Sequence, residues 1–144
     1  MKVLLNLDII LDILQKRPHH YPVSSAVLSK MLTREIVGVL PGHILPVIFY
    51  SVRQFSDERN THDVIDWFLA NMEIAPLDHF ALIRARNLDM EDFEAALIAG
   101  AAEAYGCDAI VTRRVSDFKR APVDVLTPEE LLALLNQKPG KTQP

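Results

Sequence analysis

The sequence predicts an α/β protein in which helices cover both faces of a central, mostly parallel sheet, giving three α/β/α layers. Short apolar runs alternate with segments of helical periodicity, and the chain closes with a strand followed by a helix. Its 144 residues, 49 % hydrophobic and 24 % charged, have the size and composition of one ordinary globular domain. We therefore expect residues 1–136 to form a single domain and residues 137–144 to form a polar, frayed tail.

The first half of the chain contains two predicted strands and four predicted helices. Residues 2–7 form an apolar run typical of a buried strand, and the apolar side chains that follow, up to Leu14, lie at helical spacing. Prolines at 18 and 22 mark a loop between this helix and the next. The later elements predicted here are a helix over 23–33, a strand over 36–40, a helix starting at 43–46 and a helix over 56–72.

The second half contains the helix with the clearest sequence signal, over residues 90–105, which is rich in alanine and ends at Gly106 in the position of a C-cap glycine. Thr127-Pro128-Glu129-Glu130 predicts the start of the last helix, with an N-cap, a proline in the first turn and a capping-box glutamate. The other predicted elements are strands over 73–75, 108–112 and 123–126 and a helix over 78–86.

Charge and cysteine content exclude several functional classes. A net charge of −4 argues against nucleic-acid binding through a broad basic surface, but it allows binding through a metal ion or a local arginine patch. Cys107 is the only cysteine, so neither an internal disulfide nor a cysteine zinc site can form. The start lacks a signal-peptide pattern and no apolar run approaches the ~20 residues that span a bilayer, so we expect a cytoplasmic protein without membrane contact.

The site is predicted at the carboxyl ends of the parallel strands, where ligands bind in open α/β sheets. Three segments reach that edge: Asn6-Leu7-Asp8, the helix start at residues 91–95, and the stretch from Thr112 to Phe118. Carboxylates converging there would hold Mg²⁺ or Mn²⁺, which prefer oxygen ligands and can activate water against a phosphodiester.

The same segments resemble the PIN-domain ribonucleases. Met-Lys-Val-Leu-Leu-Asn-Leu-Asp resembles the family's opening strand, Asp-Phe-Glu-Ala-Ala-Leu at residues 92–97 resembles its Asp-Phe-Glu-Asp-Ala helix, and Thr-Arg-Arg-Val-Ser-Asp-Phe at residues 112–118 resembles its Thr-Arg-Asn/Asp-x-x-Asp-Phe stretch. The order and spacing agree over nearly the whole chain. The resemblance implies a PIN fold of the kind found in VapC-like toxins, which cleave RNA with a metal held by three or four acids and pair with an antitoxin protein.

The resemblance also implies that the acidic site is degenerate. The four positions at which the family carries acids fall on Asn6, near Val47, on Ala95 and on Arg114. Such replacements remove the charge that offsets dehydration of a divalent ion. We therefore expect a nuclease-impaired protein that binds RNA or a protein partner at the cleft.

An active Mg²⁺- or Mn²⁺-dependent endoribonuclease is the alternative, with Asp8, Asp92 and Asp117 regrouped as catalytic metal ligands. On a strand Asp8 would share a face with Asn6, and Asp92 would lie one helical turn before Ala95. These acids also have ordinary explanations, because acidic residues stabilise helix starts and cap turns.

Asn6, Arg113 and Arg114 are the expected contacts to nucleic acid or a partner. The two arginines belong, with Lys119 and Arg120, to a basic cluster that is either a solvated face or a contact to phosphate or an acidic peptide. A homodimer is also expected, through apolar residues on the helices around 23–32 and 44–52. A structural subunit without a ligand is a third alternative.

Overall fold

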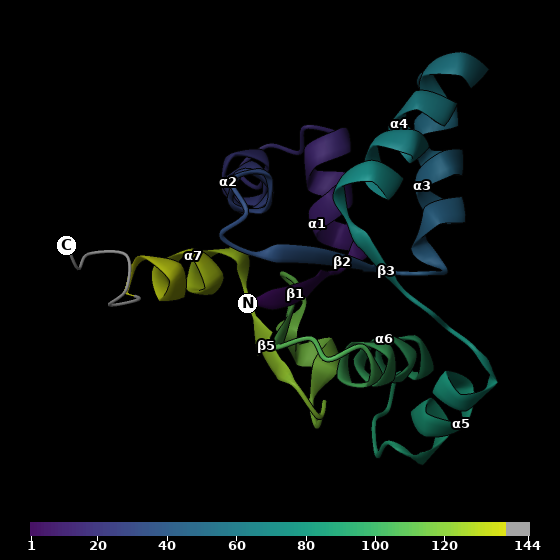
Figure 1. Ribbon diagram of the computed structural model, residues 1–144, viewed down its shortest axis with the longest axis vertical. Helices are drawn as coiled ribbons and strands as arrows, with labels where there is room; N and C mark the ends of the chain where they lie inside the picture. The colour runs from purple at the N-terminus through teal and green to yellow at the C-terminus, as the bar shows by residue number, and fades with distance from the viewer. Residues whose placement is uncertain (138–144) are drawn as a thin grey trace.

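A computed structural model describes residues 1–137 of the chain and contains one five-stranded sheet in the order β3-β2-β1-β4-β5 (Figure 1). All four strand pairs are parallel, which confirms the predicted α/β class. The strands are β1 (Lys2–Leu5), β2 (Val37–Pro41), β3 (Glu73–Ala75), β4 (Ala109–Val111) and β5 (Asp124–Leu126). The chain builds β2 and β3 on one side of β1 and then returns to build β4 on the other, so a crevice forms where β1 and β4 end.

Helices lie on both sides of this sheet (Figure 1). The helices α1, α2, α3, α4 and α7 share one face, and α5 and α6 lie on the other together with the short 3₁₀ helix η1. Their bounds are α1 (Leu7–Leu14), α2 (Tyr21–Leu32), α3 (Ile44–Arg53), α4 (Glu58–Asn71), α5 (His79–Asn87), α6 (Phe93–Ala104), η1 (Val115–Phe118) and α7 (Pro128–Asn136). No helix of the described part is long and apolar enough to cross a membrane.

The central strand β1 is buried on both faces because its side chains alternate between two apolar clusters. Val3 and Leu5 pack in the cluster under α1, α3 and α7, whereas Leu4 packs in the cluster under α6. All three are fully buried. An unbroken apolar run is what such a doubly covered parallel strand requires, and this explains why the opening residues were recognisable as a strand.

Two predicted boundaries differ from the structure in ways that matter for the site. The first strand ends at Leu5 rather than Leu7, because Asn6 is the extended N-cap of α1 and its carbonyl accepts a hydrogen bond from the amide of Ile9. The helix predicted from residue 90 begins at Phe93, because the carboxylate of Asp92 caps it by accepting from the amide of Ala95 at 2.9 Å.

The two predicted helix signals with explicit geometry are confirmed. Gly106 follows α6 with φ +79°, in the left-handed region that suits glycine. Thr127 and Glu130 form the reciprocal capping box of α7, with donor–acceptor distances of 2.8 and 3.1 Å. Most of the predicted polar tail, residues 138–144, lies outside the described residues.

Two glycine-to-alanine substitutions should change stability in opposite directions. Gly106→Ala places a β-carbon on a left-handed residue without any clash, so it should lower the free energy of unfolding by about 1 kcal/mol. Gly100→Ala lies inside α6, where a β-carbon would meet its nearest neighbour at 3.5 Å, an ordinary contact. Helix propensity should then raise stability by up to about 1 kcal/mol. Urea denaturation of both variants checks this, and equal effects would contradict it.

Candidate functional site

A cavity of about 210 Å³ lies where β1, β2 and β4 end. Asn6 and Arg114, which follow β1 and β4, line it, and so does Val47 in the first turns of α3. These are three of the four positions at which the PIN resemblance expects an acid, and the fourth, Ala95, is buried next to the lining residue Glu94. The complete lining is Asn6, Leu7, Asp8, Leu11, Arg17, His43, Ile44, Val47, Glu94, Ile98 and Arg114.

Thr112 ties the loop after β4 to the loop after β1. Its hydroxyl accepts hydrogen bonds from the side-chain amide of Asn6 at 3.3 Å and from the backbone amide of Arg114 at 3.0 Å. The same hydroxyl donates to the carboxylate of Asp8, with 3.0 and 3.2 Å to its two oxygens. Because Thr112 is completely buried, these bonds hold Asn6 and Arg114 at the cavity mouth without help from solvent.

Asp8 lies in the first turn of α1, as its explanation as a helix-start charge expected, and not on the strand, so the strand-face argument is wrong although Asp8 and Asn6 line the same cavity. Its carboxylate is buried and accepts from the amide of Arg113 at 2.8 Å as well as from Thr112. The donors of the β4 loop therefore bind mainly Oδ2 of this acid, and Oδ1 receives only a share of the Thr112 hydroxyl.

A second carboxylate, Asp12, lies one helical turn further along α1 and is completely buried. The guanidinium of Arg113 binds it in a fork, with Nε and Nη2 at 2.8 and 2.7 Å from its two oxygens. Ser24 of α2 donates to it at 3.0 Å, and Arg17 lies at 3.5 Å. Burial alone raises the pKa of Asp12, but the hydrogen bonds from Arg113 and Ser24 outweigh burial and hold the pKa below its usual value. The same fork raises the pKa of Arg113.

The structure does not bring Asp8, Asp92 and Asp117 together. Asp92 and Asp117 line a separate polar cavity of about 540 Å³, between the start of α6 and η1. Asp92 caps α6, and Asp117 pairs with the Nε of Arg114 at 2.9 Å. Within residues 1–137, no three histidine, cysteine or acidic side chains are grouped closely enough to hold a metal ion.

Cations and acids are balanced around the smaller cavity. Arg114 and Arg17 line it together with Asp8 and Glu94, and Glu94 contacts His43 at 3.4 Å. Two arginines beside two acids, one of which is bound by the β4 loop, do not make a donor set for a divalent ion, which requires several carboxylate or other oxygen ligands. PIN-domain proteins typically depend on a metal, and these residues do not fit one.

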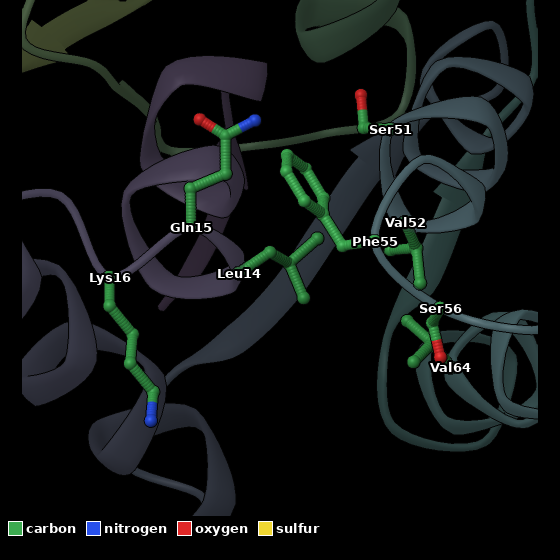
Figure 2. A pocket seen from close by; sticks show the side chains of 8 residues that line it. All are labelled: Leu14, Gln15, Lys16, Ser51, Val52, Phe55, Ser56 and Val64. Atoms are coloured by element: carbon green, nitrogen blue, oxygen red, sulfur yellow. The ribbon is translucent and has the colours of Figure 1, made fainter.

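An apolar groove lies further along the same helices. A cavity of about 420 Å³ is lined by the end of α1 and by the facing parts of α3 and α4. Figure 2 shows Leu14 and Phe55 pointing toward one another across this groove, with Lys16 directed away from it. Phe55 is 75 % exposed, an unusual degree for an aromatic side chain. The α1–α3 seam, defined here by Leu7, Leu11 and Leu14 on α1 and Val47, Ser51 and Phe55 on or just after α3, therefore carries a polar cavity at one end and an apolar one at the other.

Sequence reasoning did not select Asp12, Arg17, His43 or Glu94. Asp12 had a recognisable signal, because it is an acid four residues after Asp8 in an otherwise apolar helix. Glu94 had a weaker one, because it is an acid in the helix start at residues 91–95 that was expected at this edge, whereas Arg17 and His43 come from other elements and meet the site only in the folded chain. Of the expected contact residues, Asn6 and Arg114 line the cavity, whereas Arg113 turns inward to Asp12.

Asp12→Asn should lower the free energy of unfolding by about 3 kcal/mol at pH 7, because it leaves Arg113 beside an uncharged partner in a buried site. The pKa of Asp12 is lower in the folded state than in the unfolded chain, so its stabilisation is complete above about pH 4 and is lost as the pH falls through the folded value. Urea denaturation from pH 7 to pH 2 should show the difference between wild type and variant shrinking below about pH 4. Exposed Asp66 provides the control, since Asp66→Asn should leave stability nearly unchanged.

Comparisons with known proteins place this geometry in a family. The chain resembles, in fold, the VapBC2 complex of Rickettsia felis bound to promoter DNA, with a TM-score of 0.64 and 19 % identity over 88 % of this chain and 98 % of that chain. It is similar to DNA-bound VapBC of Salmonella typhimurium, with a TM-score of 0.65 and 17 % identity over 89 % and 98 % of the two chains.

The Mycobacterium tuberculosis toxin VapC20, described as cleaving the sarcin-ricin loop, gives a TM-score of 0.60 and 8 % identity over 85 % and 98 %. At these identities the likeness shows the fold alone. A search of curated protein sequences gave no significant match. A model of the PIN domain matches residues 2–116, most of the chain. The chain therefore belongs to the PIN-domain family.

Proposed function

We propose that this chain is a nuclease-impaired PIN-domain protein of the toxin–antitoxin type, which acts by binding an antitoxin-type protein rather than by cleaving RNA. The observation that carries the proposal is the lining of the cavity at the ends of β1 and β4. An amide, a valine and a guanidinium (Asn6, Val47 and Arg114) line it where the family carries acids.

Loss of hydrolysis follows from charge. A divalent ion needs several carboxylates to offset its dehydration, and the guanidinium of Arg114 would repel it. Asp8 is the acid nearest to Asn6 in the chain, and its oxygens accept from Thr112 and Arg113. Turning Asp8 toward a metal would leave those buried donors unsatisfied, which costs free energy.

Binding of a protein partner is supported by the α1–α3 seam. A partner segment lying along it could place apolar side chains against Leu14 and Phe55 and still reach the polar cavity at Asn6 and Arg114. Solved structures with a similar fold include a toxin–antitoxin complex from Klebsiella pneumoniae, with a TM-score of 0.65 and 15 % identity. An apolar groove with an exposed aromatic side chain at its edge suits the apolar side chains of a protein partner. The expected homodimer remains a prediction, and the exposure of Tyr50 on α3 is compatible with it.

RNA cleavage tests the loss of hydrolysis. The wild-type protein with Mg²⁺ or Mn²⁺ should cleave RNA no faster than the triple variant Asp8→Asn, Asp92→Asn, Asp117→Asn, or than the wild type in EDTA. The reason is that the structure leaves Asp8 in one cavity and Asp92 and Asp117 in another, with each acid already engaged. Metal-dependent cleavage that disappears in the triple variant would instead establish an active endoribonuclease built on regrouped acids.

A positive control restores acids at the three lining positions, as Asn6→Asp, Val47→Glu and Arg114→Asp together. Because all three side chains line one cavity, this variant should gain Mn²⁺ binding that the wild type lacks, measured by calorimetry. Failure to gain binding in a folded variant would contradict the assignment of this cavity as the counterpart of the family's site.

Partner binding can be tested with two equally exposed phenylalanines. Phe55 at the groove is 75 % exposed and Phe80 on α5 is 76 % exposed. In co-expression with antitoxin-type proteins from the same genome, Phe55→Asp should abolish co-purification, because it puts a charge in the apolar groove, and Phe80→Asp should retain it. Equal loss in both variants would remove the groove from the proposal.

A further inference from the structure

We propose that the cavity at the ends of β1 and β4 binds a phosphate-sized anion directly, through the guanidinium groups of Arg114 and Arg17 and without a metal ion. This inference rests on the proposed function in one respect, that no catalytic metal occupies the cavity. It goes further, because it gives the cavity an anion as its ligand in place of a metal cation.

Neighbouring residues hold the side chain of Arg114 in place, but its terminal N–H groups can still donate to a ligand. Its backbone amide donates to Thr112, and its Nε lies 2.9 Å from a carboxylate oxygen of Asp117 in an ion pair, which orients the side chain. The two terminal nitrogens have no hydrogen-bond partner among residues 1–137, and the side chain is 69 % exposed. A guanidinium fixed at Nε presents its remaining N–H groups as a rigid edge suited to phosphate oxygens.

Arg17 approaches the same cavity from a different element, the loop between α1 and α2. Its Nε donates to the side chain of Gln15 at 3.0 Å, and its Nη1 lies 3.5 Å from Asp12. Since Arg113 already binds both oxygens of Asp12, Arg17 is not needed to neutralise that acid. Its charge is therefore available to a ligand in the cavity.

Asp8 and Glu94 lie around the cavity, but each repels a bound anion less than an unpaired, buried carboxylate would. Hydrogen bonds from Thr112 and Arg113 spread the charge of Asp8 over the β4 loop. Glu94 is 70 % exposed and lies at the rim, where water screens it. The side-chain amide and apolar wall of Asn6, Leu11 and Val47 add no negative charge. Arg114 and Arg17 line the cavity from two separate loops, and their guanidinium groups are the donors that an anion there would use.

The volume fits a small anion. About 210 Å³ is room for roughly seven water molecules at their liquid volume of about 30 Å³ each. A phosphate group with a few waters occupies such a space. Inorganic phosphate and a phosphodiester of single-stranded nucleic acid share this chemistry, so the experiment must separate the two sources.

The test measures binding of inorganic phosphate to the full chain in EDTA and low salt, by calorimetry and by ³¹P NMR. Arg114→Gln and Arg17→Gln should each weaken binding at least tenfold. Arg86→Gln is the matched control, since Arg86 is exposed on α5 and makes no ion pair within the described residues. Glu94→Gln should tighten binding twofold to fivefold at low salt, because it removes a negative charge from the rim. Circular dichroism confirms that each variant is folded.

The sign of the Glu94 effect separates this inference from a metal site, because a cation site would lose affinity in Glu94→Gln. Wild-type binding no tighter than that of Arg114→Gln would overturn the inference even when RNA cleavage is absent. Metal-dependent cleavage would overturn the proposed function as well. When phosphate binds as expected, displacement by a short oligoribonucleotide identifies a phosphodiester as the source, and lack of displacement identifies free phosphate.

Discussion

The contact between the loop after β4 and helix α1 organises the rest of the site. Thr112 and the amide of Arg113 bind Asp8, and the guanidinium of Arg113 binds Asp12 one turn later. Both carboxylates are buried, so their charges depend on these donors and not on solvent. The arrangement fixes the angle at which α1 leaves the sheet and thereby places Asn6 opposite Arg114. Asp8 and Asp12 of α1 therefore stabilise the contact with the β4 loop, and either acid would have to give up these donors to bind a ligand.

The fold of this chain and the charge of its cavity depend on different residues. Solved structures with at most 19 % identity share this fold, because a fold depends on apolar patterning that many sequences satisfy. The charge of the cavity depends on single residues. An arginine in place of the acid that the resemblance expects, such as Arg114, changes the expected local charge by two units, and the side chain of Val47 offers no oxygen. The same scaffold thus presents a cavity suited to anions where its relatives are expected to hold a cation.

The position of the cavity on α1 and α3 connects it to the apolar groove at Phe55. Both helices contribute to both cavities, at intervals of three or four residues that keep one face turned toward the seam. The two cavities are therefore joined by the packing of only two helices, of which α1 is anchored by the pair of Arg113 and Asp12.

The sequence by itself determined the alternation of strands and helices, the left-handed turn at Gly106 and the capping box at Thr127, since each depends on neighbours within a few residues. Chain order with the parallel topology also sufficed to predict that Asn6 and Arg114 meet at one edge of the sheet.

Only the tertiary structure decided what the acids do. Asp8 turned out to begin a helix because the strand stops two residues earlier than its apolar run. Asp12 and Arg113 are 101 residues apart, and their pairing follows from the exact approach of β4 to α1, which no local pattern encodes. Hydrophobic periodicity is a local property of the chain, whereas the partner of a buried charge is determined by packing between distant segments.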